Sequence, residues 1–153
     1  MTIYLVRHAH AGKRSEWKGD DEERPVSTRG VEQSESIRDL LLAGGVGRIV
    51  SSPYVRCVQT VEPAAERTGL TVETDERLAE GADVDDSMDL LLSLASTDGA
   101  ACSHGDMIPL LLEQLVAQGM EVKGPLLHQK GSVWTIEVTD GRPVRGRYTP
   151  PSA

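Results

Sequence analysis

The sequence predicts an α/β protein with three layers, in which helices cover both faces of a mostly parallel central sheet that ends in an antiparallel hairpin. Short apolar, β-prone runs alternate with helical stretches for most of the chain, as in βαβ units. Near the C-terminus, two β-prone runs flank Asp140-Gly141, which favours a tight hairpin turn. The 153 residues fit a single domain over 1–153, and we expect 149–153 to form a flexible tail.

The first predicted strand is 2–6, "TIYLV", which is apolar enough to be buried on both faces of a sheet. The polar stretch 12–27 predicts a long surface loop, and such loops are often functional. Ser27 or Thr28 caps a helix that runs to about Ala43. The apolar residues expected on the buried side of this helix are Val31, Ile37 and Leu41.

A short buried strand is predicted at 48–50, followed by a helix with Ser52 as N-cap and Pro53 at its first position. We expect Pro63 to kink or divide this helix. The next predicted strand is 70–74, "LTVET".

The second half of the chain predicts two more helices around one strand. A helix over 85–95 carries one apolar face, and the strand 99–103 follows it. The helix after that strand is recognised by apolar residues at helical spacing, namely Ile108, Leu111, Leu112 and Leu115. The strands 132–138 and 143–148 form the final hairpin.

Three predicted strands end next to residues that suit phosphate binding. These residues are Arg7 and His8 after the first strand, Arg56 in the helix after the second, and His104 after 99–103. The carboxyl ends of parallel strands lie along one edge of a sheet, where ligands bind in open α/β folds. Guanidinium groups match phosphate oxygens in pairs, and helix N-termini favour anions. We therefore expect these side chains to bind a phosphoryl group.

One of the histidines could attack the phosphorus atom. Nearby arginines lower the pKa of an imidazole, which keeps it neutral and nucleophilic at pH 7. Positioned cations can also stabilise the charge on the phosphoryl oxygens in the transition state without a metal ion.

Two other interpretations of these residues stay open. His8 and His10 could be a metal-binding pair, although the barrel enzymes that carry such a pair need about 250 residues. Catalytic zinc typically has three protein ligands, and the remaining histidines are only His104 and His128. The second alternative is a non-catalytic phosphate-binding or regulatory module on the same fold.

Several motifs in order resemble the histidine phosphatase (phosphoglycerate-mutase-like) superfamily. "LVRHAHAG" resembles its arginine–histidine motif, "VSSPYVRCVQT" its serine–arginine motif, and "CSHGD" its second histidine motif. "RPVSTRGVEQSESI" is similar to its first helix and "KGSVWTIEV" to its late strand. The likeness covers roughly residues 2–148. Within the superfamily, the chain most resembles small SixA-type phosphohistidine phosphatases and the histidine-phosphatase domain fused to some bacterial Nudix hydrolases, the latter through "WKGDDEERPVS".

This resemblance implies a role for each matching residue. His8 is the implied nucleophile, which forms a phosphohistidine. Arg7, Arg56 and His104 complete the implied phosphate pocket, and Glu80 stands where many relatives place the acid that protonates the leaving group. The implied reaction is hydrolysis of a phosphomonoester or phosphoramidate, with no metal or other cofactor.

Four further residues are candidates for substrate binding. Arg14 could reach a second anionic group, and Ser52 could contact the phosphate through its hydroxyl or its backbone N–H. Gly105 follows the second histidine of the site, and Trp17 in the long loop could form an apolar wall beside the leaving group.

Composition limits the class of partner. The chain has 16 Lys and Arg against 24 Asp and Glu, a net charge of −8, which disfavours nucleic-acid polymers. A small phosphorylated molecule or a phosphoprotein remains possible, because local arginines can dominate one pocket. We expect a cytoplasmic protein, because the two cysteines suggest no disulfide framework and neither a signal peptide nor a membrane-spanning run is recognisable. The oligomeric state is not predicted.

Overall fold

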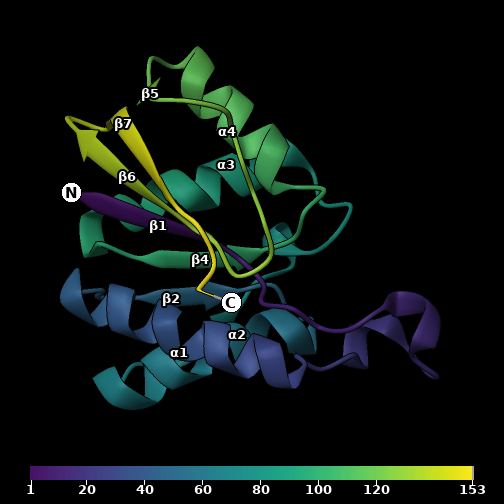
Figure 1. Cartoon of the computed structure of the whole chain (residues 1–153). Coiled ribbons are helices and arrows are strands. Elements are labelled where there is room, and N and C mark those ends of the chain that lie inside the picture. Colours follow the sequence, from purple (N-terminus) through teal and green to yellow (C-terminus); the bar gives the residue numbers. More distant parts are fainter. Residues whose placement is uncertain (153) are drawn as a thin grey trace.

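The computed structural model describes residues 1–152, and its centre is a seven-stranded sheet with the order β3-β2-β4-β1-β6-β7-β5 (Figure 1). β1 to β4 are mutually parallel where they pair, whereas β6 pairs antiparallel with both β1 and β7. The predicted α/β fold, with a mostly parallel sheet and a C-terminal hairpin, is confirmed. The strands are β1 (Thr2–Arg7), β2 (Ile49–Ser51), β3 (Val72–Thr74), β4 (Ala100–Ser103), β5 (Glu121–Val122), β6 (Val133–Thr139) and β7 (Arg142–Thr149).

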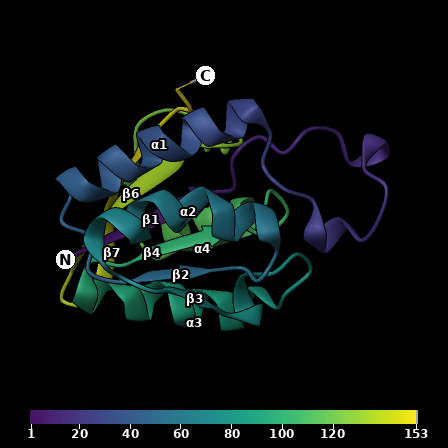
Figure 2. The same ribbon diagram turned by 90° about the horizontal axis from the view of Figure 1, so that it is seen from below.

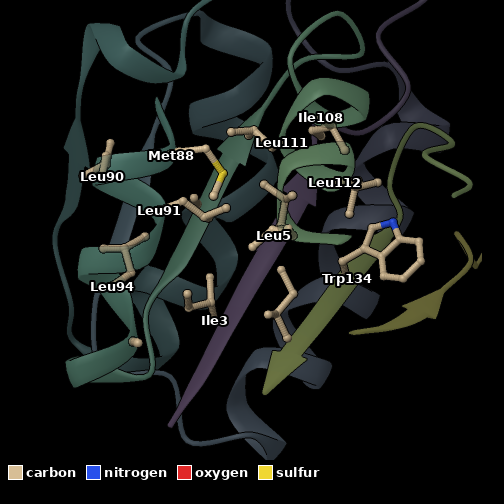
Figure 3. Packing of buried hydrophobic residues seen from close by; sticks show 14 of the residues in the cluster. Ile3, Leu5, Met88, Leu90, Leu91, Leu94, Ile108, Leu111, Leu112 and Trp134 are labelled. Carbon is tan, nitrogen blue, oxygen red and sulfur yellow. The ribbon is translucent and has the colours of Figure 1, made fainter. Parts of the chain in front are cut away.

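Two helices cover each face of this sheet (Figures 1 and 2). The helices are α1 (Thr28–Ala43), α2 (Val55–Thr68), α3 (Val84–Ser93) and α4 (Ile108–Ala117). Because successive strand residues point to opposite faces, Ile3 and Leu5 of β1 pack with α3 and α4 (Figure 3), while Tyr4 and Val6 pack with α1 and α2. The run "TIYLV" is therefore apolar throughout because both of its faces are buried.

The buried face of α1 differs from the prediction at one position. Ser27 caps the helix as expected, since its hydroxyl accepts a hydrogen bond from the Gly30 N–H at 3.1 Å. Val31, however, is 47% exposed, so its predicted place in the core is wrong. A Cβ added to Gly30 would lie 2.1 Å from the His10 carbonyl oxygen, so only glycine fits at this close approach. The face of α1 that carries Gly30 is therefore the face that packs against the segment after β1. The buried residues are Gly30, Gln33, Ser34, Ile37 and Leu41.

The predicted start of α2 is also wrong. The helix begins at Val55, and Tyr54 rather than Ser52 is the N-cap residue. Pro63 does not divide the helix, which runs without interruption from Val55 to Thr68. Val61 and Ala64, on either side of the proline, are fully buried, and this packing holds the helix against the sheet despite the lost backbone donor.

The remaining differences lie at the ends of elements. The apolar stretch predicted as a helix over 85–95 is α3 followed by the short 3₁₀ helix η4 (Leu94–Thr97). The two-residue strand β5 was not predicted, because a pair of residues carries no recognisable periodicity. Thr149 pairs with Val133 in the sheet, so it is not part of the predicted tail, while 153 lies outside the described residues. Among the helices of residues 1–152, none is long and apolar enough to cross a membrane.

Candidate active site

The carboxyl edge of the parallel strands brings the predicted catalytic residues together. Arg7 ends β1 and His8 follows it, Arg56 lies in the first turn of α2 after β2, and His104 directly follows β4. The rings of His8 and His104 are 5.5 Å apart. A cavity of about 790 Å³ opens at this edge, and His8, Arg7, Arg56 and Glu80 are among the residues that line it.

His8 has the geometry of a neutral nucleophile. Its side chain is buried, and its Nδ1 lies 2.9 Å from the carbonyl oxygen of Ala9. That oxygen can only accept a hydrogen bond, so Nδ1 carries the proton and Nε2 keeps its lone pair. Burial lowers the pKa of His8 to about 3, reinforced by His104, Arg56 and Arg7 and opposed by the bond to Ala9. The imidazole is therefore uncharged at pH 7.

The half-buried Arg7 and the buried Arg56 each have one donor that no protein group accepts. Arg7 donates from Nη1 to the His128 carbonyl oxygen at 2.7 Å, and Arg56 donates from Nη2 to Glu80 Oε1 at 2.8 Å. The Nε atoms of both arginines are buried and have no hydrogen-bond partner. Buried polar groups are normally paired, so two orphaned cationic donors at a cavity indicate the place of an anion.

The ring of His104 is held by two neighbouring side chains, Ser52 and Cys57. Its Nε2 lies 2.8 Å from Ser52 Oγ and 3.5 Å from Cys57 Sγ, both of which are buried. The opposite nitrogen, Nδ1, lies 3.5 Å from Glu80 Oε1. The Ser52 hydroxyl, which we expected to cap α2 or contact the phosphate, instead holds the ring of His104 with Nδ1 on the side of Glu80.

Glu80 lies where the resemblance implied an acid. It follows the 3₁₀ helix η3 (Glu76–Leu78), and its Oε1 accepts hydrogen bonds from Arg14 at 2.9 Å and from Arg56 at 2.8 Å. The Asp106 carboxylate holds this turn by accepting the Gly81 N–H at 2.8 Å. The carboxyl group of Glu80 thus borders both the cavity and His104.

The other predicted binding residues differ in their positions. Gly105 lines the cavity, and a Cβ added there would lie 2.5 Å from Arg7 Nη2, so the glycine leaves space for that guanidinium. Arg14, in the 3₁₀ helix η1 (Arg14–Glu16), also lines the cavity, with a side chain that is 62% exposed. Trp17 is not among the residues that line this cavity. It lines an adjoining hollow of about 240 Å³ that shares Gly12, Lys13 and Arg24 with the cavity, so its contact with a leaving group stays a prediction. Its indole donates to the Asp20 carbonyl oxygen at 2.9 Å, which turns the ring toward its own loop.

Sequence reasoning missed several cavity residues in loops. Arg24 and Lys130 line the cavity, and Asp21 binds Arg56 at 3.0 Å. Asp21 and Arg24 belong to the predicted loop 12–27, for which the sequence suggested a possible function but no role for these two residues. The signal that could have found them is the opposite charge of these two residues at a spacing of three within a long loop.

His8 and His10 do not point to a shared partner. His10 Nδ1 lies 2.6 Å from Ser27 Oγ at the start of α1, whereas His8 Nδ1 contacts Ala9. Within residues 1–152, no three His, Cys, Asp or Glu side chains form a group that could hold a metal ion.

Comparisons with known proteins point to one family. The family model of the histidine phosphatase superfamily (branch 1) matches residues 3–86, more than half of the chain. The chain is 34% identical over 155 residues to a protein of Mycolicibacterium smegmatis named 8-oxo-(d)GTP phosphatase, a match over 98% of this chain and 48% of that protein. It is also 32% identical over 84 residues to a probable phosphoglycerate mutase, GpmB, of Yersinia pestis, over 52% of this chain and 38% of the relative. The chain thus spans about half or less of the length of these curated relatives.

Solved structures share the fold. The protein histidine phosphatase SixA in complex with tungstate superposes with a TM-score of 0.75 at 21% identity, over 98% of this chain and 95% of that one. A putative phosphohistidine phosphatase SixA from Nakamurella multipartitia gives a TM-score of 0.78 at 22% identity, over 99% of this chain and 96% of that one. The match to the family model, the arrangement of His8, Arg7, Arg56 and His104, and the shared fold lead to one conclusion: the chain belongs to branch 1 of the histidine phosphatase superfamily.

Proposed function

We propose that this domain is a metal-independent phosphatase that hydrolyses a phosphomonoester or phosphoramidate through a phosphohistidine intermediate on His8. The observation that carries the proposal is the pair of buried, unpartnered Nε donors of Arg7 and Arg56 beside the neutral imidazole of His8. These donors suit two oxygens of a phosphoryl group, and the lone pair on His8 Nε2 suits attack on its phosphorus atom.

In the first step, His8 Nε2 forms a bond to phosphorus while the bond to the leaving atom breaks. Arg7, Arg56 and His104 stabilise the charge on the phosphoryl oxygens. Glu80, which lies 3.5 Å from His104 Nδ1, keeps its Oε1 paired with Arg14 and Arg56, and in its protonated form it donates a proton from Oε2 to the leaving oxygen or nitrogen and becomes a carboxylate. The dephosphorylated product departs, and His8 carries the phosphoryl group.

In the second step, a water molecule attacks the phosphorus atom and the N–P bond breaks. The Glu80 carboxylate accepts a proton from this water, so the same group acts first as acid and then as base. Inorganic phosphate leaves, and His8 and Glu80 return to their starting protonation states.

A nucleotide is the substrate class with most support, while phosphoproteins and sugar phosphates share the same reacting group. The relative that matches 98% of this chain is named for a nucleotide substrate. Lys13, Arg14 and Lys130 also line the cavity, which places more cations there than one phosphoryl group needs. Burial and the surrounding arginines lower the pKa of Lys130, which reflects this gathering of positive charge.

The test is phosphate release from p-nitrophenyl phosphate in excess EDTA. We expect activity in the wild type and a loss of more than about 1,000-fold in His8→Ala, since a nucleophile acts as a unit with its partners. His10→Ala is the matched control, because it removes the neighbouring imidazole, which contacts Ser27 instead of the cavity.

Quenching the wild type during turnover with an alkaline denaturant should trap a phosphoryl group on His8 that is stable in base and is lost in acid. Activity that disappears with EDTA would support a metal site. Phosphate binding without turnover of any phosphorylated compound would instead support the alternative, a regulatory module on the same fold.

A further inference from the structure

One carboxylate in the long loop binds three arginines of the site. Asp21 begins the 3₁₀ helix η2 (Asp21–Glu23), and the sequence alone predicted no role for it, although it lies in the stretch "WKGDDEERPVS". Its Oδ1 accepts a hydrogen bond from Arg24 Nε at 3.0 Å. Its Oδ2 pairs with Arg56 Nη2 at 3.0 Å and with Arg14 Nη2 at 3.2 Å.

Asp21 holds both terminal nitrogens of Arg56. Its carboxylate accepts from Nη2, and its backbone carbonyl oxygen accepts from Nη1 at 2.8 Å. A guanidinium is planar, so fixing its two terminal nitrogens fixes the plane of the group and the direction of its Nε–H. That Nε is the buried donor without a partner. Glu80 also contacts Arg56, but only through Nη2.

Arg24 in turn holds Asp21 in place. The Arg24 side chain is buried, and its Nη1 donates to the Ala11 carbonyl oxygen at 2.6 Å. Ala11 is itself buried, three residues after His8. A continuous series of contacts therefore leads from the segment behind the nucleophile, through Arg24 and Asp21, to Arg56.

The charge of Asp21 is maintained by its partners. Burial alone raises the pKa of this carboxyl, but the hydrogen bonds from Arg24 and Arg56 and the nearby Arg14 bring it below its usual value. Asp21 is therefore ionised at pH 7, which is the form that accepts from all three guanidinium groups.

We propose that Asp21 is a positioning residue for the reaction, which fixes Arg56 so that its free Nε donor faces the phosphoryl group. This inference rests on the proposed function and adds to it the means by which the loop 12–27 affects catalysis. Asp21 touches no reacting atom in this role, and it acts through Arg56.

The test compares Asp21→Asn, Asp21→Ala and the control Glu22→Gln. Asp21→Asn keeps the size of the side chain and the backbone carbonyl contact but removes the charge. Glu22→Gln removes the same charge from the next residue of the same turn, which is exposed. The measurements are the Kd for inorganic phosphate by titration calorimetry, the thermal unfolding midpoint, and kcat and KM for p-nitrophenyl phosphate.

We expect both Asp21 variants to weaken phosphate binding and to lower kcat/KM by roughly 10-fold, as for residues coupled in one ion-pair network. Glu22→Gln should stay within about 2-fold of the wild type. A double-mutant cycle separates positioning from loop folding: once Arg56→Gln has removed the guanidinium, adding Asp21→Asn should cost little more.

Suppose that the wild type binds phosphate and turns over substrate. If Asp21→Asn then does both equally well, the inference fails while the proposed function stands. The inference also fails if the effects of Asp21→Asn and Arg56→Gln are fully additive, because Asp21 then acts independently of Arg56. A wild type that binds no phosphate contradicts the inference and the proposed function together.

Discussion

The buried residues around His8 and the loop 12–27 form two parts of one cavity, and they are held in different ways. Arg7, His8 and His104 lie at or next to the ends of sheet strands, Arg56 lies in the first turn of α2, and all four are at least half-buried. Arg14 in the loop has a side chain that is 62% exposed, and ion pairs to Asp21 and Glu80 are what hold it. The loop projects beyond the strand ends in Figure 1. The sheet and the start of α2 therefore place the groups that we propose for phosphoryl transfer, while the loop holds Arg56 through Asp21 and offers Arg14 for contacts to the rest of a substrate.

After loss of His8 itself, the largest effect is expected when a substitution disturbs the buried part without touching a charge. Gly105→Ala places a methyl group 2.5 Å from Arg7 Nη2, so the guanidinium has to leave its present position. We expect kcat/KM to fall by about 100-fold, the cost of displacing a positioning group by about 1 Å.

The matched measurement for Gly105→Ala repeats it in an Arg7→Ala background, where the methyl group has nothing to displace. The added alanine should then cost little. Wild-type kinetics in Gly105→Ala alone would show that Arg7 does not need the position seen in the structure.

A smaller effect is expected in the exposed part. Arg14→Gln removes a solvent-exposed charge, so we expect KM to rise by about 10-fold or less with kcat nearly unchanged. The effect should shrink as salt is raised from low to physiological concentration, because exposed charges are screened. A fall in kcat at saturating substrate would place Arg14 among the groups that act in the chemical step.

The smallest effect concerns stability and pH. The pKa of His8 is about 3 in the folded protein and about 6.5 in the unfolded chain, so the unfolded state binds more protons between these values. The free energy of unfolding should therefore decrease as pH falls from about 6.5 toward 3.

Chemical denaturation at pH 7 and pH 4.5 measures this, with His8→Gln as the comparison because glutamine does not titrate. The decrease should be smaller in the variant. An equal decrease in both proteins would mean that His8 is not buried as a neutral ring. In the wild type, His8 itself should not cause a loss of kcat/KM near pH 6.5.

The same division explains what the sequence could predict. Arg7, His8 and His104 were found because each directly follows an apolar strand, and the strands of a parallel sheet end along one edge. Asp21 was missed because its partners Arg14, Arg24 and Arg56 come together only when the loop folds back on α2. No local periodicity records such contacts.

Two errors on helices have a similar origin. The sequence around Ser52 satisfies the local rule for an N-cap, but His104, 52 residues away, takes its hydroxyl. Val31 has a spacing compatible with the core, but the close approach of Gly30 to His10 rotates α1 so that Val31 faces solvent. In both cases a long-range contact overrode a correct local preference.

The position of β1 has a consequence for protein synthesis. β1 lies between β4 and β6, and the backbone and side chain of Arg7 bond to Ser132 and His128. The ribosome makes β1, which leads to the proposed nucleophile, before the other strands of this domain, yet β1 gains its second neighbour only after residues 133–139 have emerged. Until then β1 lacks its antiparallel partner β6, so the segment that carries His8 is not yet held on both sides.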